Sequence, residues 1–458
     1  MSSALKTIPY VRQYLSGLLW TLVDSVGSQT LVIAYHFFLR AYTGLEIHGA
    51  IGCLYSLLYL STALANVGLD KSLAPFLELF TSSKKAFLIF LWTLGIQLFF
   101  IGTVSTLFVL NAKYLTEHVP VLKSLTVHLS PLVLSTVAVA FFFENFRKTV
   151  RTFLQLSFYF RATAFIELFG ICGSLCALPF LFYYGSLTVE TVFIVHALLC
   201  VAQTVFLCGV LFSFYQSLQN SVSESRVTLQ LVTRMVKTRF NAWILHCLSQ
   251  LYSGNFLVPL CVLKFGVSSA SLLKVMTSIA YWIALLSKNV FGTTSNAVLA
   301  HLKSRSAQTQ QEAFHYLSLV ANQALYCLII FLLINGQKIL LAQVTDESPI
   351  SWSLLYFMLL INFFEGFFVL YEKWYILEED AFIYVLLNAV SLGVLYLIIP
   401  ALLTAPAILA MILSIRIVTF LAILIVSFYR WKIWPPLKPQ PLPIISAILV
   451  SGMYYLLA

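Results

Sequence analysis

Long apolar runs separated by short polar segments repeat along almost the whole chain of 458 residues. A run of about 20 apolar residues is long enough to cross the hydrocarbon core of a membrane as an α-helix. Twelve such runs predict twelve spanning helices. The predicted spans are 14–39, 47–69, 86–111, 119–143, 162–183, 189–213, 240–263, 269–299, 314–335, 352–371, 381–401 and 405–429.

The pattern changes after the twelfth run. The stretch WPPLKPQPLP, residues 434–443, contains prolines that cannot continue a helix, and it predicts an extended linker. The final segment, LPIISAILVSGMYYLLA, is apolar but short for a crossing. A short thirteenth span, an interfacial segment and a docked hairpin end are all compatible with this composition.

The composition supports a membrane protein. Hydrophobic residues make up 60% of the chain and charged residues 10%, with a mean hydropathy of +0.92, whereas soluble domains have about 25% charged residues. The first run continues to Leu39 without a cleavage-site pattern, so we expect a spanning helix there and not a removed signal peptide. The predicted fold class is all-α, a polytopic membrane helical bundle.

The basic residues are distributed unevenly between the apolar runs. With the N-terminus in the cytoplasm, nineteen Lys and Arg residues lie on the inner side and five on the outer side, which is the bias typical of cytoplasmic loops. This bias accounts for most of the net charge of +10 without a nucleic-acid partner. The longest inner segment, 214–239, then separates an N-terminal six-helix lobe, 1–213, from a C-terminal six-helix lobe, 240–430, which is followed by the linker and tail, 431–458.

Two ionisable residues lie near the middle of predicted spans. At about 1.5 Å of rise per residue, Asp24 is about 18 Å from Arg12 and about 24 Å from Arg40 along the first span. Arg416 is about 21 Å from Arg430 along the twelfth span. Both side chains are compatible with a water-filled cavity and also with internal ion pairs that have no role in transport.

The eighth span carries two lysines, Lys274 and Lys288. Measured from Lys303 at the inner interface, Lys288 is about 22 Å deep and Lys274 about 21 Å further out. Their spacing places both on one face of an α-helix, with polar residues between them. A charge in mid-membrane costs at least about 2.5 to 3.5 kcal/mol unless it faces a partner or water. Snorkelling to the outer surface for Lys274, and a salt bridge or inward snorkelling for Lys288, are the structural alternatives.

Uncharged polar residues concentrate in the first two helices of each half. Asn66 lies near the end of the second span, and His246 and Gln250 lie in the seventh. Together with Asp24, these residues predict a polar cavity between the halves, in which they would bind a coupling ion or line the wall. His246 is also compatible with a packed, hydrogen-bonded histidine.

No catalytic pattern accompanies these residues. The sequence contains no H-E-x-x-H zinc motif and no Walker-type G-x-x-x-x-G-K-[ST] phosphate loop. We therefore expect a protein that is not an enzyme and holds no metal or organic cofactor. Any pumping would use an ion gradient of H⁺ or Na⁺, the membrane potential or the substrate's own gradient.

The passage RAYTGLEIHGAIGCLYSLLYLSTALANVGLDKSLAPFLE, residues 40–78, resembles a segment of known transporters. It resembles the connection between the first two helices in polysaccharide-type flippases of the multidrug/oligosaccharidyl-lipid/polysaccharide exporter superfamily. The matching residues are Arg40, Gly44, Glu46 and Gly49 in the turn, and Gly68 and Leu69 at the helix end. Asn66 replaces the family's usual Asp, and Tyr42 and His48 are further departures from the pattern.

This resemblance implies two six-helix lobes in a V, with cavity walls formed by the first, second, seventh and eighth spans. It also implies transfer of a polyprenyl-pyrophosphate-linked oligosaccharide from the inner to the outer leaflet by alternating access. On this hypothesis Lys274, Lys288, Arg416 and Arg40 bind the diphosphate, since Lys acts as a point charge and Arg grips phosphate in a bidentate manner.

Two other functions stay open at this point. A multidrug or organic-cation antiporter of the same fold would use Asp24, although Lys274 and Lys288 would repel a cation. A non-transporting integral glycan-assembly protein is the third reading. For the flippase we expect a monomer in the inner (cytoplasmic) membrane of a bacterium, and a eukaryotic homologue in the endoplasmic reticulum is the lesser alternative. Its expected partners are membrane lipids, the lipid-linked glycan and the glycan polymerase machinery.

Overall fold

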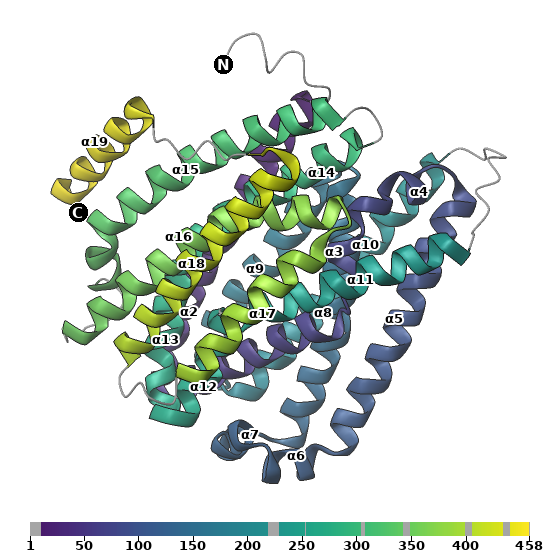
Figure 1. Cartoon of the computed structure of the whole chain (residues 1–458). Helices are drawn as coiled ribbons and strands as arrows, with labels where there is room; N and C mark the ends of the chain where they lie inside the picture. Colours follow the sequence, from purple (N-terminus) through teal and green to yellow (C-terminus); the bar gives the residue numbers. More distant parts are fainter. Residues whose placement is uncertain are drawn as a thin grey trace. The chain divides into compact units, whose positions relative to one another are not determined.

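A computed structural model describes residues 11–218, 229–251, 253–303, 307–341, 349–398, 405–433 and 440–457. Within these ranges the regular structure is helical throughout, as predicted (Figure 1). The contacts divide the chain into two compact units. We call Gly27–Lys274 the continuous unit, and Met1–Val26 with Val275–Ala458 the discontinuous unit. This division differs from the predicted lobe boundaries, because α2 and α13 each contribute residues to both units.

Helix α2, Val11–Ala65, contains the first two predicted spans. The two parts meet at Gly44, whose φ of 77° and ψ of 179° interrupt the helical backbone. Glycine adopts this conformation without the steric penalty that a Cβ would cause. The glycine-containing turn expected at this point is therefore a sharp kink within one long element.

Most of the remaining helices of the continuous unit follow the predicted spans. The long ones are α5 (Lys84–Leu110), α8 (Pro131–Leu156), α9 (Phe160–Tyr183), α10 (Val189–Ser217), α11 (Leu229–Gln250) and α12 (Gly254–Phe265). Short helical turns connect them, namely α3 (Leu69–Ser72), η1 (Ala74–Phe76), α4 (Leu77–Thr81), α6 (Ala112–His118), α7 (Pro120–Ser124) and η2 (Thr126–His128). Helix α8 packs against α5 and α10, and α10 also packs against α9.

The fourth span begins later than predicted. The prediction placed it at 119–143, but α6, α7 and η2 occupy much of 112–128 and α8 begins at Pro131. Proline is favoured in the first helical turn, and the Ser130 side chain accepts a hydrogen bond from the Val133 backbone N–H. The charged residues Glu144 to Arg151 consequently lie within α8 and not in a loop after it.

The predicted inter-lobe loop is shorter in the structure. Helix α10 extends to Ser217, and α11 already begins at Leu229, inside the range 214–239 that was assigned to the loop. The seventh span is also divided, because α11 ends at Gln250 and α12 begins at Gly254.

The eighth span is a composite element. It consists of α13 (Val267–Leu285), a π-helical segment η3 (Leu286–Gly292) and α14 (Thr293–Leu302). A π-helix has a wider turn than an α-helix. The predicted stripe from Lys274 to Lys288 assumed unbroken α-helical geometry, and this assumption fails at η3.

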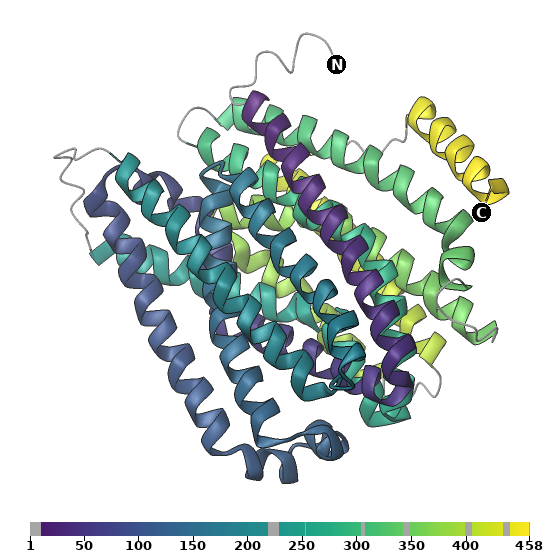
Figure 2. The same ribbon diagram turned by 180° about the vertical axis from the view of Figure 1, so that it is seen from behind.

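The discontinuous unit contains four further long helices and the tail. These are α15 (Ala307–Leu341), α16 (Pro349–Leu377), α17 (Ala381–Ile398), α18 (Ala405–Trp431) and α19 (Pro441–Leu457). Helix α16 packs against α15 and α18, and α17 against α18. The tail helix α19 lies along α15 (Figures 1 and 2), and the Gln440 N–H donates to Gln323 Oε1 at 2.9 Å. The tail is thus docked on α15. Residues 434–439 of the predicted linker lie outside the described residues.

Eight helices in the described ranges are long and apolar enough to cross a membrane. One of them is α2, which contains two predicted spans. The other three predicted spans fall short because α8 carries charges, the α11–α12 pair is interrupted, and α13–α14 contains the π segment. These observations agree with a polytopic helical bundle of about twelve spans.

Gly68 is a position at which substitution should be costly. Its φ of 71° is left-handed, and a Cβ there would overlap the carbonyl oxygen of Arg239 and lie 2.7 Å from the backbone N of Trp243. For Gly68→Ala we expect a stability loss of at least about 2 kcal/mol, from backbone strain and overpacking together. Thermal unfolding in detergent measures it. Gly95→Ala in α5 is the matched control, because a Cβ there meets nothing within 4 Å. Equal unfolding temperatures for the two variants would contradict this account.

Candidate functional site

Arg416 lies on α18 inside the discontinuous unit, where it is 2% exposed. Its guanidinium forms an ion pair with Glu365 on α16 and donates from Nη1 to Asn388 Oδ1 on α17 at 2.7 Å. The group also stacks over the Phe368 ring, 4.3 Å from the centroid. Three helices are therefore joined through one arginine. This geometry corresponds to the internal ion-pair alternative for Arg416, and its predicted contact with a diphosphate gains no support.

Asp24 lies on the part of α2 that belongs to the discontinuous unit and is 2% exposed. Thr21 and Ser25 are buried beside it on the same helix, and Thr21 Oγ1 donates to the Gly17 carbonyl at 2.6 Å. A carboxylate in this setting is costly unless it has a function or a partner. Its coupling role stays a prediction.

The backbone of Lys288 lies in η3, and its side chain is outside the described part of the structure.

A buried histidine pair lies next to Lys274 in the continuous unit. His36 Nδ1 is 3.2 Å from His48 Nε2, and His48 Nδ1 is 2.8 Å from Ser271 Oγ. His48 is one of the departures from the flippase pattern, and here it links the two arms of α2 to α13. Lys274 lies one helical turn after Ser271, and its side-chain stem packs against Gly52.

Arg40, the fourth predicted phosphate ligand, lies on α2 before the kink and is half-buried. It is close enough to His48 for an electrostatic interaction. The structure thus brings Arg40 and Lys274 near the same histidine pair. Phosphate binding by these two residues stays a prediction.

The Asn66 side chain forms hydrogen bonds to Thr149 and to the backbone of Asp70. Its Nδ2 donates to Thr149 Oγ1 on α8 at 3.0 Å, and its Oδ1 accepts from the Asp70 backbone N–H at 3.1 Å. The side chain is fully buried. It therefore connects the start of α3 to α8, while its predicted role in the cavity stays untested.

His246 and Gln250 lie on successive turns of α11. His246 Nε2 is 3.3 Å from Lys148 Nζ, which is itself 3.3 Å from Asp70 Oδ2. Gln250 Oε1 accepts from Ser253 Oγ at 3.3 Å, in the break between α11 and α12. His246 belongs to a polar network with α8, and Gln250 stabilises the break.

A buried cluster of charged side chains on α8 and α9 was not predicted. Arg147 on α8 donates from Nε to Glu144 Oε2 at 2.9 Å and also pairs with Glu167 on α9. Arg151 Nη1 is 3.5 Å from Glu167 Oε1. Both carboxylates are at most 6% exposed. The sequence signal was the i,i+3 spacing of Glu144 and Arg147, but the misplaced fourth span assigned these charges to a loop.

No protein-family model matches this chain, and no curated protein matches it either. Solved structures do match. The MATE multidrug transporter DinF-BH, solved as a ligand complex, superposes with a TM-score of 0.74 and 11% identity, covering 94% of this chain and 98% of that one. A MATE protein in the straight conformation gives a TM-score of 0.72 and 15% identity over 94% and 97% of the two chains.

A third match is a MOP-superfamily transporter from Pyrococcus furiosus, described as having a binding pocket of reverse polarity that suggests a different function. Its TM-score is 0.68 at 13% identity, with 94% of this chain and 97% of that chain covered. At such low identity the similarity concerns the fold alone. Over nearly its whole length, this chain has the fold of the MATE transporters of the MOP superfamily.

Proposed function

We propose that this chain is an integral membrane transporter that works by alternating access. The observation that carries the proposal is the fold similarity over 94% of the chain to transporters of this architecture. Similar structures include both an outward-facing and an inward-facing conformation, with TM-scores of 0.69 and 0.64. Buried ionisable residues within predicted spans support a transport role, because lipid-facing positions do not tolerate them.

For the substrate, we propose an organic cation exchanged for H⁺ or Na⁺. Two arginines that lie in membrane helices, Arg147 and Arg416, are paired with carboxylates, so their charges are neutralised and do not favour a diphosphate. Asp24 is a buried acidic residue of the first predicted span. The similar transporter DinF-BH is described as a multidrug transporter, which agrees with this reading. Asp24 is the residue that we assign to ion coupling.

Transfer of a lipid-linked oligosaccharide is the second candidate. The resemblance of residues 40–78 to polysaccharide-type flippases favours it, and the kink at Gly44 falls within that segment. Lys274 and Arg40, near the buried histidine pair, would then supply the positive charge for the diphosphate. One similar structure is described as having a binding pocket of reverse polarity. This description agrees with proteins of this fold having substrates of different charge.

A reconstituted assay tests both candidates. In vesicles with an imposed pH or Na⁺ gradient, we expect the wild-type protein to accumulate a fluorescent organic cation. Asp24→Asn should lower this accumulation at least about tenfold, equivalent to about 1.4 kcal/mol, because the amide cannot exchange a proton or bind Na⁺ by charge. Glu117→Gln is the matched control, since that carboxylate is exposed on α6. It should leave accumulation unchanged.

The same vesicles can be loaded with a fluorescent polyprenyl-pyrophosphate sugar. Transfer of this lipid between leaflets without cation uptake would replace the first substrate proposal by the second. If neither compound moves with a folded protein, the transporter proposal itself is wrong.

A further inference from the structure

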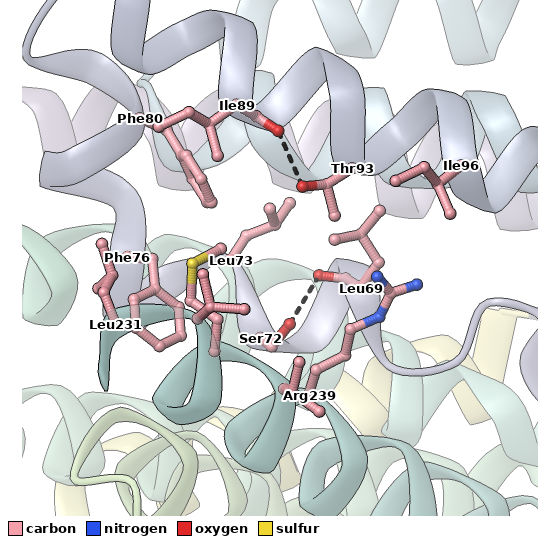
Figure 3. Close-up of a pocket in the computed structure, with 13 residues that line it drawn as sticks. Leu69, Ser72, Leu73, Phe76, Phe80, Ile89, Thr93, Ile96, Leu231 and Arg239 are labelled. Carbon is pink, nitrogen blue, oxygen red and sulfur yellow. Dashed lines mark hydrogen bonds between the residues drawn. The ribbon is translucent and has the colours of Figure 1, made fainter. Parts of the chain in front are cut away.

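A pocket opens on the surface of the continuous unit between α5, α11 and the short helices α3, η1 and α4 (Figure 3). Its volume is about 270 Å³. Sites for drug-sized ligands usually measure about 300 to 1,000 Å³. The space is therefore better suited to part of a slender molecule than to a bulky transported substrate.

The walls of the pocket are apolar even where the lining residues carry hydroxyl groups. Thr93 Oγ1 donates to the Ile89 carbonyl at 2.8 Å, and Ser72 Oγ donates to the Leu69 carbonyl at 3.3 Å (Figure 3). Both hydroxyl protons are thus used within their own helices. The remaining wall consists mainly of Leu, Ile, Phe, Val and Met side chains.

One end of the pocket carries a cation, Arg239 on α11 (Figure 3). Its Nε donates to the Val67 carbonyl at 2.9 Å, and its Nη2 donates to Gln97 Oε1 at 2.8 Å. Among the residues that the structure describes, no carboxylate forms an ion pair with this guanidinium, and Nη1 has no bonded acceptor. Asp70 attracts it electrostatically but is paired with Lys148. Arg239 can therefore donate to an additional anionic oxygen.

The position of the pocket along α5 corresponds to a membrane interface. Lys84 and Lys85 begin α5, and the rest of that helix to Leu110 contains no charge. At about 1.5 Å per residue, the lining residues Ile89 and Ile96 lie about 6 Å and 16 Å beyond Lys85. The pocket thus extends from the level of lipid headgroups into the hydrocarbon layer.

The rim of the pocket has the surface expected for lipid contact. Ile96 on α5 and Val236 on α11 line it and are 67% and 61% exposed. The exposed charges on the elements that form the pocket are Lys85, Arg234, Lys237 and Glu78, so cations predominate. Arg234 stacks over Phe76, a lining residue, at 5.7 Å. Lys and Arg side chains next to a membrane surface attract anionic lipids, and each one contributes about 1 kcal/mol to the attraction.

We propose that this pocket binds one acyl chain of an anionic phospholipid, whose phosphate contacts Arg239. The apolar walls accept the chain, and the unbonded Nη1 group provides the phosphate contact. A bound lipid would join α5, α11 and the segment from Leu69 to Phe80 by contacts to each. The site lies wholly within the continuous unit and is separate from the residues assigned to transport.

Native mass spectrometry of the full chain in detergent tests the site, with dioleoyl phosphatidylglycerol and dioleoyl phosphatidylcholine as probes. The two lipids have the same chains and differ in net headgroup charge. We expect one phosphatidylglycerol to bind at least tenfold more tightly than phosphatidylcholine and to raise the unfolding temperature. Arg239→Gln should remove the preference for phosphatidylglycerol.

A second variant keeps the test decisive if loss of Arg239 disturbs folding. Val232→Trp fills the mouth of the pocket at an exposed position and should weaken phosphatidylglycerol binding at least tenfold. Leu107→Trp is its matched control, because that residue is exposed on α5 but does not line the pocket. Equal binding of the two lipids by the wild type, or unchanged phosphatidylglycerol binding in Val232→Trp, overturns the proposal. Since this readout needs no transport, it is independent of the proposed function.

Discussion

Replacing Arg147 by Met should destabilise the protein by about 3 to 5 kcal/mol, because it leaves buried carboxylates without their main partner. Glu144 loses its charge-assisted hydrogen bonds, and Glu167 keeps the longer contact with Arg151 at 3.5 Å. The measurement is thermal unfolding of the purified protein in detergent, together with the yield of folded protein from membranes. We expect a large loss in both.

Two further variants isolate the cause. Arg161→Met removes an exposed cation of α9 that stacks over the Phe165 ring at 5.7 Å, and its effect should stay within about 1 kcal/mol. Adding Glu144→Gln and Glu167→Gln to Arg147→Met removes the unneutralised charges and should restore much of the stability. An Arg147→Met protein as stable as the wild type would show that the cluster does not hold α8 and α9 together.

The Arg416–Glu365 pair should behave in the same way in the discontinuous unit. Arg416→Leu leaves Glu365 buried and unneutralised and should cost about 3 to 5 kcal/mol, whereas the double variant Arg416→Leu/Glu365→Leu should recover most of this loss. Unfolding temperature and transport of the cationic dye are measured on all three proteins. Restored stability with restored transport identifies the pair as a connection between α16 and α18.

A different result would restore the phosphate hypothesis for Arg416. If the double variant is stable but transports nothing, the guanidinium acts on the substrate and the structural reading is wrong. Arg430→Leu is the control, because its pair with Asp380 is partly exposed and such pairs are worth about 0 to 1 kcal/mol. Its unfolding temperature should stay near that of the wild type.

The helical bundle could be predicted from the sequence because hydropathy is a direct physical requirement of the membrane. Runs such as those of α5 and α10 are strongly apolar over most of their length, and their predicted bounds lie within a few residues of the structure. The break between the first two spans was also expected, since Gly44 suits a backbone that other residues avoid.

The fourth span shows why other bounds were missed. Hydropathy alone does not distinguish residues 112–128 from the start of a span, and the cap formed by Ser130 and Pro131 fixes where α8 begins. The charges of α8 were then assigned to a loop, although Arg147 and Arg151 pair with Glu167 on the next helix. Partners from other helices, like Glu365 for Arg416, depend on packing that a single sequence does not contain.

The charge balance of the two buried clusters determines how they respond to a membrane potential. Arg416 and Glu365 cancel one another, and the two arginines of the Glu144 cluster cancel its two carboxylates. Moving one net charge through the full field requires about 2.3 kcal/mol per 100 mV, but a neutral pair that moves as a body requires almost none. Movement of either cluster as a body would therefore be nearly electrically silent. Voltage dependence of transport would then report charges outside these clusters, namely those of the substrate, the coupling ion and ionisable residues such as Asp24 and Lys274.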